Sequence, residues 1–251
     1  MTKKLFTFWI PLSLVIAVLM WSLFSIGEAL VGDGGRESCF VNLSHIYNGL
    51  DRHDREHGHL PPVFHSDDNS KPLYSWRVAM LPHLGRGDLM SEIQPNLPWN
   101  DEAHSVLRNT RIRNFHCRYD PGTQTDTSYV AIVGDNTLFP TKNTKTDNLA
   151  TRKLSEGASN TILVAEVANS SINWMEPRDI SLEDASLPIN SKKGQSISST
   201  HPPATSKARG ACTLFADGRF VFLNEKTDPK ILRTLLEIDS PDKPKEKYIS
   251  P

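Results

Sequence analysis

One long apolar segment near the N-terminus constrains this chain more than any other feature. Residues 5–27, LFTFWIPLSLVIAVLMWSLFSIG, contain no charged side chain over twenty-three positions. A helix that rises about 1.5 Å per residue crosses the hydrocarbon core of a bilayer with about 20 apolar residues. Lys3 and Lys4 precede the segment, and Glu28 and Asp33 follow it. This asymmetry predicts a single-pass cell-membrane protein with a cytoplasmic N-terminus and the remaining chain outside the cytoplasm.

A cleaved signal peptide is the alternative interpretation of the same segment. Gly27 and Ala29 are small enough to form a cleavage site. The apolar region of a signal peptide normally spans about 7–15 residues, which is shorter than the segment found here. The length favours a retained anchor over residues 1–27, and cleavage stays open.

Composition narrows the classes of partner and cofactor. The formal net charge is −1, so there is no basic surplus to attract nucleic acid. The three cysteines are Cys39, Cys117 and Cys212, and their odd number leaves at least one thiol without an intramolecular partner. No CxxC pair or Cys/His spacing of a zinc motif occurs. We therefore expect no metal, no cofactor and no nucleic-acid partner.

A helix is expected soon after the apolar segment. Its apolar positions recur at helical spacing and are Cys39, Leu43, Ile46, Tyr47 and Leu50. Gly58 suits the C-terminal cap, and the two prolines that follow at 61–62 prevent continuation. Gly32 to Gly35 would form a hinge between anchor and helix, which places a hinge region at residues 28–38.

Several further elements are predicted from local signals. Ser75 and Asn100 could each cap a short helix, the second over residues 101–109. Strands are expected over residues 112–117, 129–133 and 160–166, and a long loop over 181–208.

Two elements are predicted near the C-terminus. The run ACTLFADGRFVFLN places Asp217-Gly218 between two apolar segments, which is typical of a hairpin with a type I′ turn. Asp228 and Pro229 then open a helix. Its expected buried face consists of Ile231, Leu232, Leu235 and Leu236. Residues 239–251 are charged and are expected to be a disordered tail.

Seven sequence blocks resemble, in order, those of a large bacterial family of prepilin-like secreted proteins of unknown function. That family is recognised by an N-terminal prepilin methylation motif and a C-terminal H-x9-DG motif. The matching blocks are CFVNL at 39–43, HGHLPP at 57–62, SWRV at 75–78, PWN at 98–100, FHC at 115–117, GASNTIL at 157–163 and LFADG at 214–218. The resemblance implies an α+β, pilin-like domain over residues 39–238, in which the helix packs against an antiparallel sheet.

The N-terminus departs from the family pattern. Where the family has the glycine and glutamate used for processing and filament assembly, this chain has Leu5 and Ile10. Fifteen residues, rather than nine, separate His201 from Asp217. The resemblance therefore implies a pseudopilin-like protein that keeps its anchor and does not assemble filaments.

The resemblance also implies roles for single residues. Cys39 and Cys117 match family cysteines, which implies a disulfide between them, with Cys212 reduced and buried. The family blocks further contain a set of expected structural motif residues, namely Asn160, Glu166, His201, Asp217 and Gly218.

Potential chemistry is sparse, and each candidate has a structural alternative. His53, Glu56, His57 and His59 are the best metal candidate, but they equally suit a solvated helix end. His201 with Asp217 could form an acid/base pair, although turn geometry explains Asp217-Gly218.

Two further candidates concern binding. Glu166 could orient a ligand, or it could bond nearby backbone N–H groups or Arg77. Trp76 and Trp99 could stack on a sugar, or they could pack in the core. We expect a non-catalytic structural or interaction protein, with a protein partner or self-association, and keep an extracellular solute- or glycan-binding module as the alternative.

Overall fold

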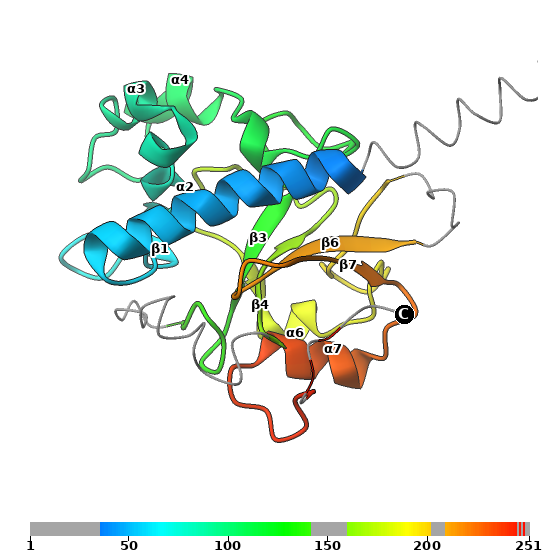
Figure 1. Ribbon diagram of the computed structural model, residues 1–251. Coiled ribbons are helices and arrows are strands. Elements are labelled where there is room, and N and C mark those ends of the chain that lie inside the picture. The colour runs from blue at the N-terminus through cyan, green and yellow to red at the C-terminus, as the bar shows by residue number, and fades with distance from the viewer. Residues whose placement is uncertain (1–35, 142–159, 202–208, 245, 247, 249–251) are drawn as a thin grey trace, which may run out of the picture.

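The computed structural model describes residues 36–141, 160–201, 209–244, 246 and 248. The predicted anchor at residues 1–27 and the glycine hinge at 32–35 lie outside these residues. Within the described part of the chain, no helix is both long enough and apolar enough to cross a membrane. The described residues form an α+β domain in which helices cover both faces of one sheet (Figure 1).

The main sheet has five strands in the order β5-β3-β4-β6-β7. Its strands are β3 Tyr129–Val133, β4 Ile162–Glu166, β5 Ile180–Ser181, β6 Gly210–Phe215 and β7 Phe220–Asn224. All neighbours are antiparallel except β3 and β5, which are parallel. A separate hairpin pairs β1 Phe64–Ser66 with β2 Pro72–Ser75. The predicted strands at 129–133 and 160–166 are confirmed as β3 and β4.

The first described element is a helix over residues 36–57, called here the long helix. Its predicted stripe is confirmed, since four of the five residues are fully buried: Cys39, Leu43, Ile46 and Leu50. The helix ends as expected at Gly58, which has φ of 78° and donates its backbone N–H to the Asp54 carbonyl at 2.8 Å. Figure 1 shows this helix crossing one face of the sheet.

Successive side chains of a strand point to opposite faces of the sheet, so the domain has two hydrophobic cores, one on each face. On β6, Cys212 and Leu214 belong to the core beneath the long helix, whereas Ala211 and Phe215 belong to the opposite core. The opposite core is closed by α6 and α7. Both faces of the sheet are therefore covered, and its central strands β3, β4 and β6 are buried except at Val133, which is partly buried.

The remaining helices are short. They are α2 Trp76–Ala79, η1 Pro82–Leu84, α3 Gly87–Met90, η2 Glu102–His104, α4 Ser105–Arg108, η3 Arg113–Phe115, α6 Leu182–Ala185 and α7 Pro229–Leu236. The Ser75 cap is confirmed, because its hydroxyl accepts the Arg77 backbone N–H at 3.2 Å. The Asp228 cap and Pro229 start of α7 are also confirmed.

Four local predictions are wrong. Asp101, not Asn100, caps the helical turn at 102–104, because its carboxylate accepts the Ala103 N–H at 2.9 Å. Residues 112–117 contain the turn η3 and no strand. The expected loop at 181–208 begins with α6, whose apolar residues complete a core. Ile231 lies outside the buried face of α7 and is 41% exposed.

The Asp217-Gly218 hairpin is confirmed, but its turn type is not I′. Gly218 has φ of 86°, while Asp217 is absent from the described residues with positive φ. Gly218 N–H donates to the Phe215 carbonyl, and Phe215 N–H donates to the Arg219 carbonyl, both at 2.9 Å. This is a three-residue loop, a type I turn followed by a glycine bulge. A Cβ on Gly218 would lie 2.7 Å from the Tyr47 ring, so this glycine also lets the long helix approach the hairpin.

Asn160 connects the sheet to the C-terminal segment. Its side-chain amide donates to the Pro244 and Glu246 carbonyls at 2.8 and 2.7 Å, and its side-chain oxygen accepts the Tyr248 N–H at 2.8 Å. Arg219 from the hairpin donates to the Tyr248 carbonyl at 3.0 Å. The expected disorder of residues 239–251 is therefore wrong for the described residues of this segment.

Candidate functional site

Four side chains from distant segments meet beneath the long helix. Cys39 comes from that helix, Cys117 follows η3, Glu166 ends β4, and His201 lies in the segment after α6. We call these four residues the thiol–histidine–carboxylate cluster. One heteroatom from each residue takes part, and these atoms all lie within 4.8 Å of one another.

His201 Nε2 is at the centre of the cluster. It lies 3.1 Å from Cys39 Sγ, 3.0 Å from Cys117 Sγ and 2.9 Å from Glu166 Oε1. The two sulfur atoms are 3.0 Å apart, and Cys39 Sγ is 3.7 Å from the same carboxylate oxygen. The side chains of Glu166 and His201 are only 2% and 3% exposed, so the cluster is closed to solvent.

Hydrogen bonds with neighbouring polar groups hold Cys117 and Glu166 of the cluster in position. The Cys117 backbone N–H donates to Ser128 Oγ at 2.8 Å, and that hydroxyl donates to Asp120 Oδ2 at 2.7 Å. The second oxygen of Glu166 accepts the Cys212 backbone N–H at 3.0 Å. Two sheet strands and the segment before β3 therefore orient the cluster.

A second set of contacts positions His201. Ser198 N–H donates to the Glu166 carbonyl at 3.0 Å, which ties the His201 segment to the end of β4. The Thr200 hydroxyl donates to the Tyr119 carbonyl at 2.6 Å, and the Tyr119 ring lies 5.5 Å from that of His201. The histidine is thus placed by backbone pairing and by an aromatic neighbour.

Burial and proximity shift the pKa values in the cluster. Burial alone lowers the pKa of His201, but its hydrogen bonds to Cys117 and Glu166 and the Glu166 charge raise the pKa to about 10. The Cys39 hydrogen bond and burial raise the pKa of the Cys117 thiol. The Cys117 hydrogen bond lowers the pKa of Cys39, but the Cys212 hydrogen bond and burial shift it upward overall. Burial and the hydrogen bonds of the cluster therefore disfavour the thiolate forms of Cys39 and Cys117 and favour the charged form of His201 in their pKa values.

This geometry does not match a nucleophilic triad. In a triad, the acid orients the histidine through one ring nitrogen while the other nitrogen activates the nucleophile. Here Glu166 and both sulfurs contact the same nitrogen, and the buried Nδ1 of His201 has no hydrogen-bond partner among the described residues. The raised pKa values of Cys39 and Cys117 also disfavour the thiolate, which is the nucleophilic form of cysteine.

The structure brings the predicted disulfide partners together without joining them. Cys39 and Cys117 are free thiols, and their 3.0 Å sulfur separation exceeds the disulfide bond length of about 2.05 Å. Cys212 is a free thiol and fully buried, as expected.

The other sequence candidates are placed differently. His53, His57 and His59 gather at the end of the long helix, with ring centroids 4.2–6.4 Å apart. Glu56 approaches His83 at 3.9 Å. Among the described residues, however, only the thiol–histidine–carboxylate cluster brings three or more possible ligand atoms close together. His201 pairs with Glu166, and Asp217 pairs with Arg219 at 2.7 Å, so each has a different partner from the one an acid/base pair would need.

Trp76 is fully buried, so it is not exposed for stacking on a sugar. Its ring packs 5.9 Å from that of Phe139, and its Nε1 donates to Asp179 at 3.2 Å. Trp99 is half-buried against the core, and its backbone N–H donates to the Leu73 carbonyl. Both tryptophans therefore have a packing role, the alternative given for them from sequence.

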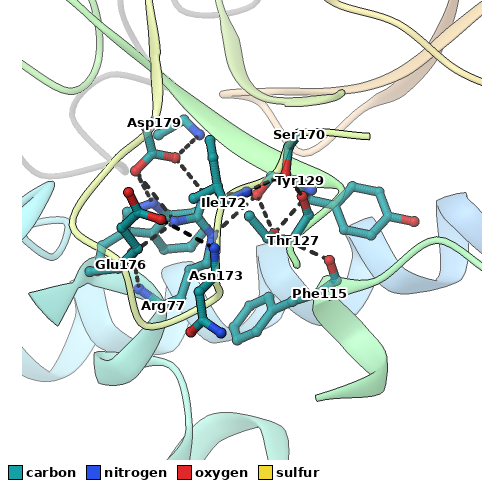
Figure 2. A network of polar contacts seen from close by, with 12 residues as sticks. Arg77, Phe115, Thr127, Tyr129, Ser170, Ile172, Asn173, Glu176 and Asp179 are labelled. Carbon is teal, nitrogen blue, oxygen red and sulfur yellow. Dashed lines mark hydrogen bonds and ion pairs between the residues drawn. The ribbon is translucent and has the colours of Figure 1, made fainter. Parts of the chain in front are cut away.

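A second buried polar cluster surrounds Arg77, which we call the Arg77 network (Figure 2). Arg77 Nη2 lies 2.5 Å from Asp179 Oδ1, and both side chains are fully buried. The guanidinium also donates to the Tyr129 carbonyl at 3.0 and 3.2 Å, and Asp179 accepts the Ala131 N–H at 2.7 Å. Of the two structural partners considered for Glu166, the backbone N–H is the one found, from Cys212, whereas Arg77 is occupied by Asp179.

Sequence reasoning had named all members of the thiol–histidine–carboxylate cluster, but in separate roles. Fold and site together define an α+β domain whose N-terminal helix is linked to its sheet through buried thiols, a histidine and a carboxylate. The model of a family described as a protein of unknown function (DUF1559) matches residues 35–230, and the chain belongs to that family. The match includes every residue of the cluster. No curated protein and no solved structure matches the chain.

Proposed function

We propose that this protein is a membrane-anchored, extracytoplasmic structural or interaction protein of pseudopilin-like design, without catalytic activity. The main support is the long helix, which precedes all described strands and lies along one face of a largely antiparallel sheet. The family resemblance implies this arrangement for a pilin-like subunit. The apolar segment at residues 5–27 supplies the anchor that such a subunit needs.

Two contacts would make the helix and the sheet behave as one rigid unit. Near its start, Cys39 enters the thiol–histidine–carboxylate cluster. Further along the apolar stripe of the same helix, Tyr47 packs against the glycine of the Asp217-Gly218 turn. A domain held rigidly on its anchor helix suits presentation of a surface to a partner or to a second copy.

Lack of filament assembly follows from the N-terminal sequence. Leu5 and Ile10 occupy the positions of the family's processing glycine and assembly glutamate. A bulky residue would hinder the peptidase, and an isoleucine provides no carboxylate to pair with a neighbouring subunit. The same departures motivate a membrane-bound, uncleaved product.

Intact mass measurement of the membrane-extracted protein tests this proposal. We expect the mass of the full chain in the membrane fraction, and processing to rise when Leu5→Gly and Ile10→Glu are introduced together. A product that begins at Leu5, Phe6 or Leu30, or filaments formed by the unmodified chain, would contradict it. The same mass spectrum, taken without reductant, shows whether Cys39 and Cys117 form the implied disulfide.

Solute binding is the second candidate, and one observation favours it. A cavity of about 700 Å³ lies beside the exposed face of the long helix. Its polar lining includes His45, Asp51, Arg52, Arg55, His83 and Asn114. Native mass spectrometry separates the two functions: a co-purified small molecule supports binding, whereas self-association or a bound protein supports the structural role.

A further inference from the structure

The thiol–histidine–carboxylate cluster has the composition and the geometry of a metal site. We propose that it binds one divalent metal ion of the zinc type in a closed, four-coordinate arrangement. The four ligand atoms would be Cys39 Sγ, Cys117 Sγ, Glu166 Oε1 and His201 Nε2. This inference goes beyond the proposed function and does not depend on how the chain is anchored.

The separations between the four atoms fit an ion at their centre after a small expansion. Zinc–sulfur bonds of about 2.3 Å and zinc–nitrogen bonds of about 2.0–2.1 Å place tetrahedral ligand atoms about 3.3–3.8 Å apart. The measured separations that involve His201 or the two sulfurs are 2.9–3.1 Å, and Cys39 Sγ to Glu166 Oε1 is 3.7 Å. The sixth separation, between Cys117 Sγ and a Glu166 carboxylate oxygen, lies within 4.8 Å, so tetrahedral positions require shifts of up to about 1 Å.

Hydrogen bonds account for only some of the close contacts in this cluster. The proton on His201 Nε2 can serve one of the three groups within 3.1 Å of that nitrogen, and the Cys39 thiol can donate to either Cys117 Sγ or Glu166 Oε1. A metal ion instead accepts one lone pair from each of the four atoms. Four possible ligand atoms within 4.8 Å of one another suit coordination, whereas a hydrogen-bonded pair requires only two.

The donor chemistry selects the kind of ion. Thiolate and imidazole ligands favour zinc over magnesium or calcium, which prefer oxygen ligands. On binding, each thiol releases its proton to solvent and His201 releases the proton on Nε2, so that two thiolates and a neutral imidazole become ligands. The dication then balances two of the three negative charges that the thiolates and Glu166 carry. Because all four positions come from protein and the site is buried, the ion would have a structural role.

Supporting contacts favour the bound arrangement. Ser128 and Asp120 fix the backbone at Cys117, and the Cys212 N–H holds the second oxygen of Glu166. Such outer contacts orient ligands and are typical of metal sites. The ligands come from different segments, with Cys39 on the long helix and Glu166 at the end of strand β4. The ion would therefore join the long helix to the sheet.

A Cys39–Cys117 disulfide is the competing outcome. It would bring the sulfurs from 3.0 Å to about 2.05 Å and would consume both thiolate ligands. It would also leave His201 and Glu166 paired with each other, and among the described residues the Cys212 N–H would be the further partner of the Glu166 carboxylate. The two outcomes exclude each other and differ in mass, because disulfide formation removes two hydrogen atoms.

The test uses the full-length chain, purified in mild detergent with no chelator. Elemental analysis measures zinc per chain, and cobalt(II) added to the reduced, metal-free protein provides a spectroscopic probe. We expect about one zinc per chain and a cobalt spectrum with thiolate charge-transfer bands and the intense visible bands of a tetrahedral ion. These two measurements need no variant, so they remain informative if a ligand substitution impairs folding.

Matched variants then assign the ligands. Cys117→Ser and His201→Gln should each lower the affinity for zinc by at least tenfold, as loss of a ligand requires. Cys212→Ala removes a buried thiol next to the cluster but outside the four ligands, so it should keep the zinc content. His57→Gln controls for ions held by the exposed histidines at the end of the long helix and should also keep it.

Each of the following results would contradict the proposed metal site. Absence of tetrahedral cobalt bands in the reduced wild-type chain would overturn the proposal. So would zinc that survives in Cys117→Ser and His201→Gln but disappears in His57→Gln. A purified chain that is two mass units lighter, with Cys39 linked to Cys117 and no zinc binding after reduction, would replace the metal site with the disulfide. None of these results depends on whether the chain is anchored or cleaved.

Discussion

The Arg77 network and the thiol–histidine–carboxylate cluster are both buried and polar, yet they differ in how their groups are satisfied. In the Arg77 network, donors and acceptors are matched: the guanidinium meets Asp179, and the other contacts are made by backbone groups, the Ser75 hydroxyl and the Trp76 indole (Figure 2). In the cluster, one histidine nitrogen is shared by three groups. A satisfied network needs nothing more to be stable, whereas shared contacts around one point indicate a site for something further.

Sequence signals for the two regions were also different. Arg77 belongs to a motif that was recognised, but its partner Asp179 was not identified. All four cluster residues were named, but as a disulfide pair and two motif residues. The difference shows that residue type indicates which chemical group a position provides. The residue that this group contacts is decided by which strands and loops lie side by side in the fold.

The largest expected effect comes from breaking the Arg77 network. Arg77→Met leaves the Asp179 carboxylate buried and uncompensated, which should lower the free energy of unfolding by about 3–5 kcal/mol. Urea denaturation measures this loss. Arg77→Met combined with Asp179→Asn should recover part of it, because the unpaired charge is then removed.

The comparison predicts that this variant loses stability without losing bound metal. Arg77→Met should keep the metal content of the folded protein, while Cys117→Ser should lose it. If Arg77→Met melted like the wild type, the predicted stabilisation by the Arg77 network would be wrong. If it lost zinc while still folded, the two clusters would not be separate.

The next effect concerns the contact that seats the long helix over the cluster. Gly218→Ala introduces a Cβ at positive φ, which costs roughly 1–2 kcal/mol, and this Cβ would lie 2.7 Å from the Tyr47 ring. Overpacking adds about 1–3 kcal/mol. Gly58→Ala is the matched control, since Gly58 also has positive φ but has open space around its Cβ position. Equal destabilisation in both variants, measured by urea denaturation, would show that the Tyr47 contact does not restrict this position.

His53 provides a third case, a buried titratable group with no acidic partner among the residues that the structure describes. Burial lowers the pKa of His53 to about 4, and the nearby His57, His59 and His83 act in the same direction. The unfolded chain binds more protons than the folded one between about pH 6.5 and 4, so stability should fall as the pH decreases through this range. Comparing melting temperatures across this range for the wild type, His53→Gln and the exposed control His57→Gln measures the effect.

A flatter pH profile is expected for His53→Gln only. The carboxylates also titrate toward the lower end of this range, and they contribute equally to all three proteins. If His57→Gln flattened the profile as much as His53→Gln, burial of His53 would not be the cause.

The smallest effect is expected at a more exposed ion pair. Arg219 and Asp217 are 2.7 Å apart, with side chains 25% and 11% exposed, in contrast to the fully buried Arg77 and Asp179. Asp217→Asn keeps an oxygen to accept the Arg219 backbone N–H and should change the free energy of unfolding by less than about 1 kcal/mol. A loss as large as that of Arg77→Met in the same denaturation experiment would show that exposure does not separate the two pairs.

Local features of the fold were predictable because they depend on neighbours in sequence. The apolar stripe of the long helix, the Gly58 cap, the Ser75 cap, and Asp228 with Pro229 each depend on residues within about four positions. The Asp217-Gly218 hairpin was predictable for the same reason. Its turn type was not, because three-residue and two-residue loops share the same Asp-Gly signal, and because the approach of Tyr47 also acts on the glycine.

The apolar segment at residues 5–27, the pattern of the long helix and the caps were determined by the sequence itself, through propensity and periodicity. The convergence of Cys39 with Cys117, Glu166 and His201 was decided by tertiary structure, because these contacts span 78, 127 and 162 positions. No spacing rule connects residues so far apart. They meet because β4 pairs with β6 and because the long helix crosses that part of the sheet, which is a property of packing between elements.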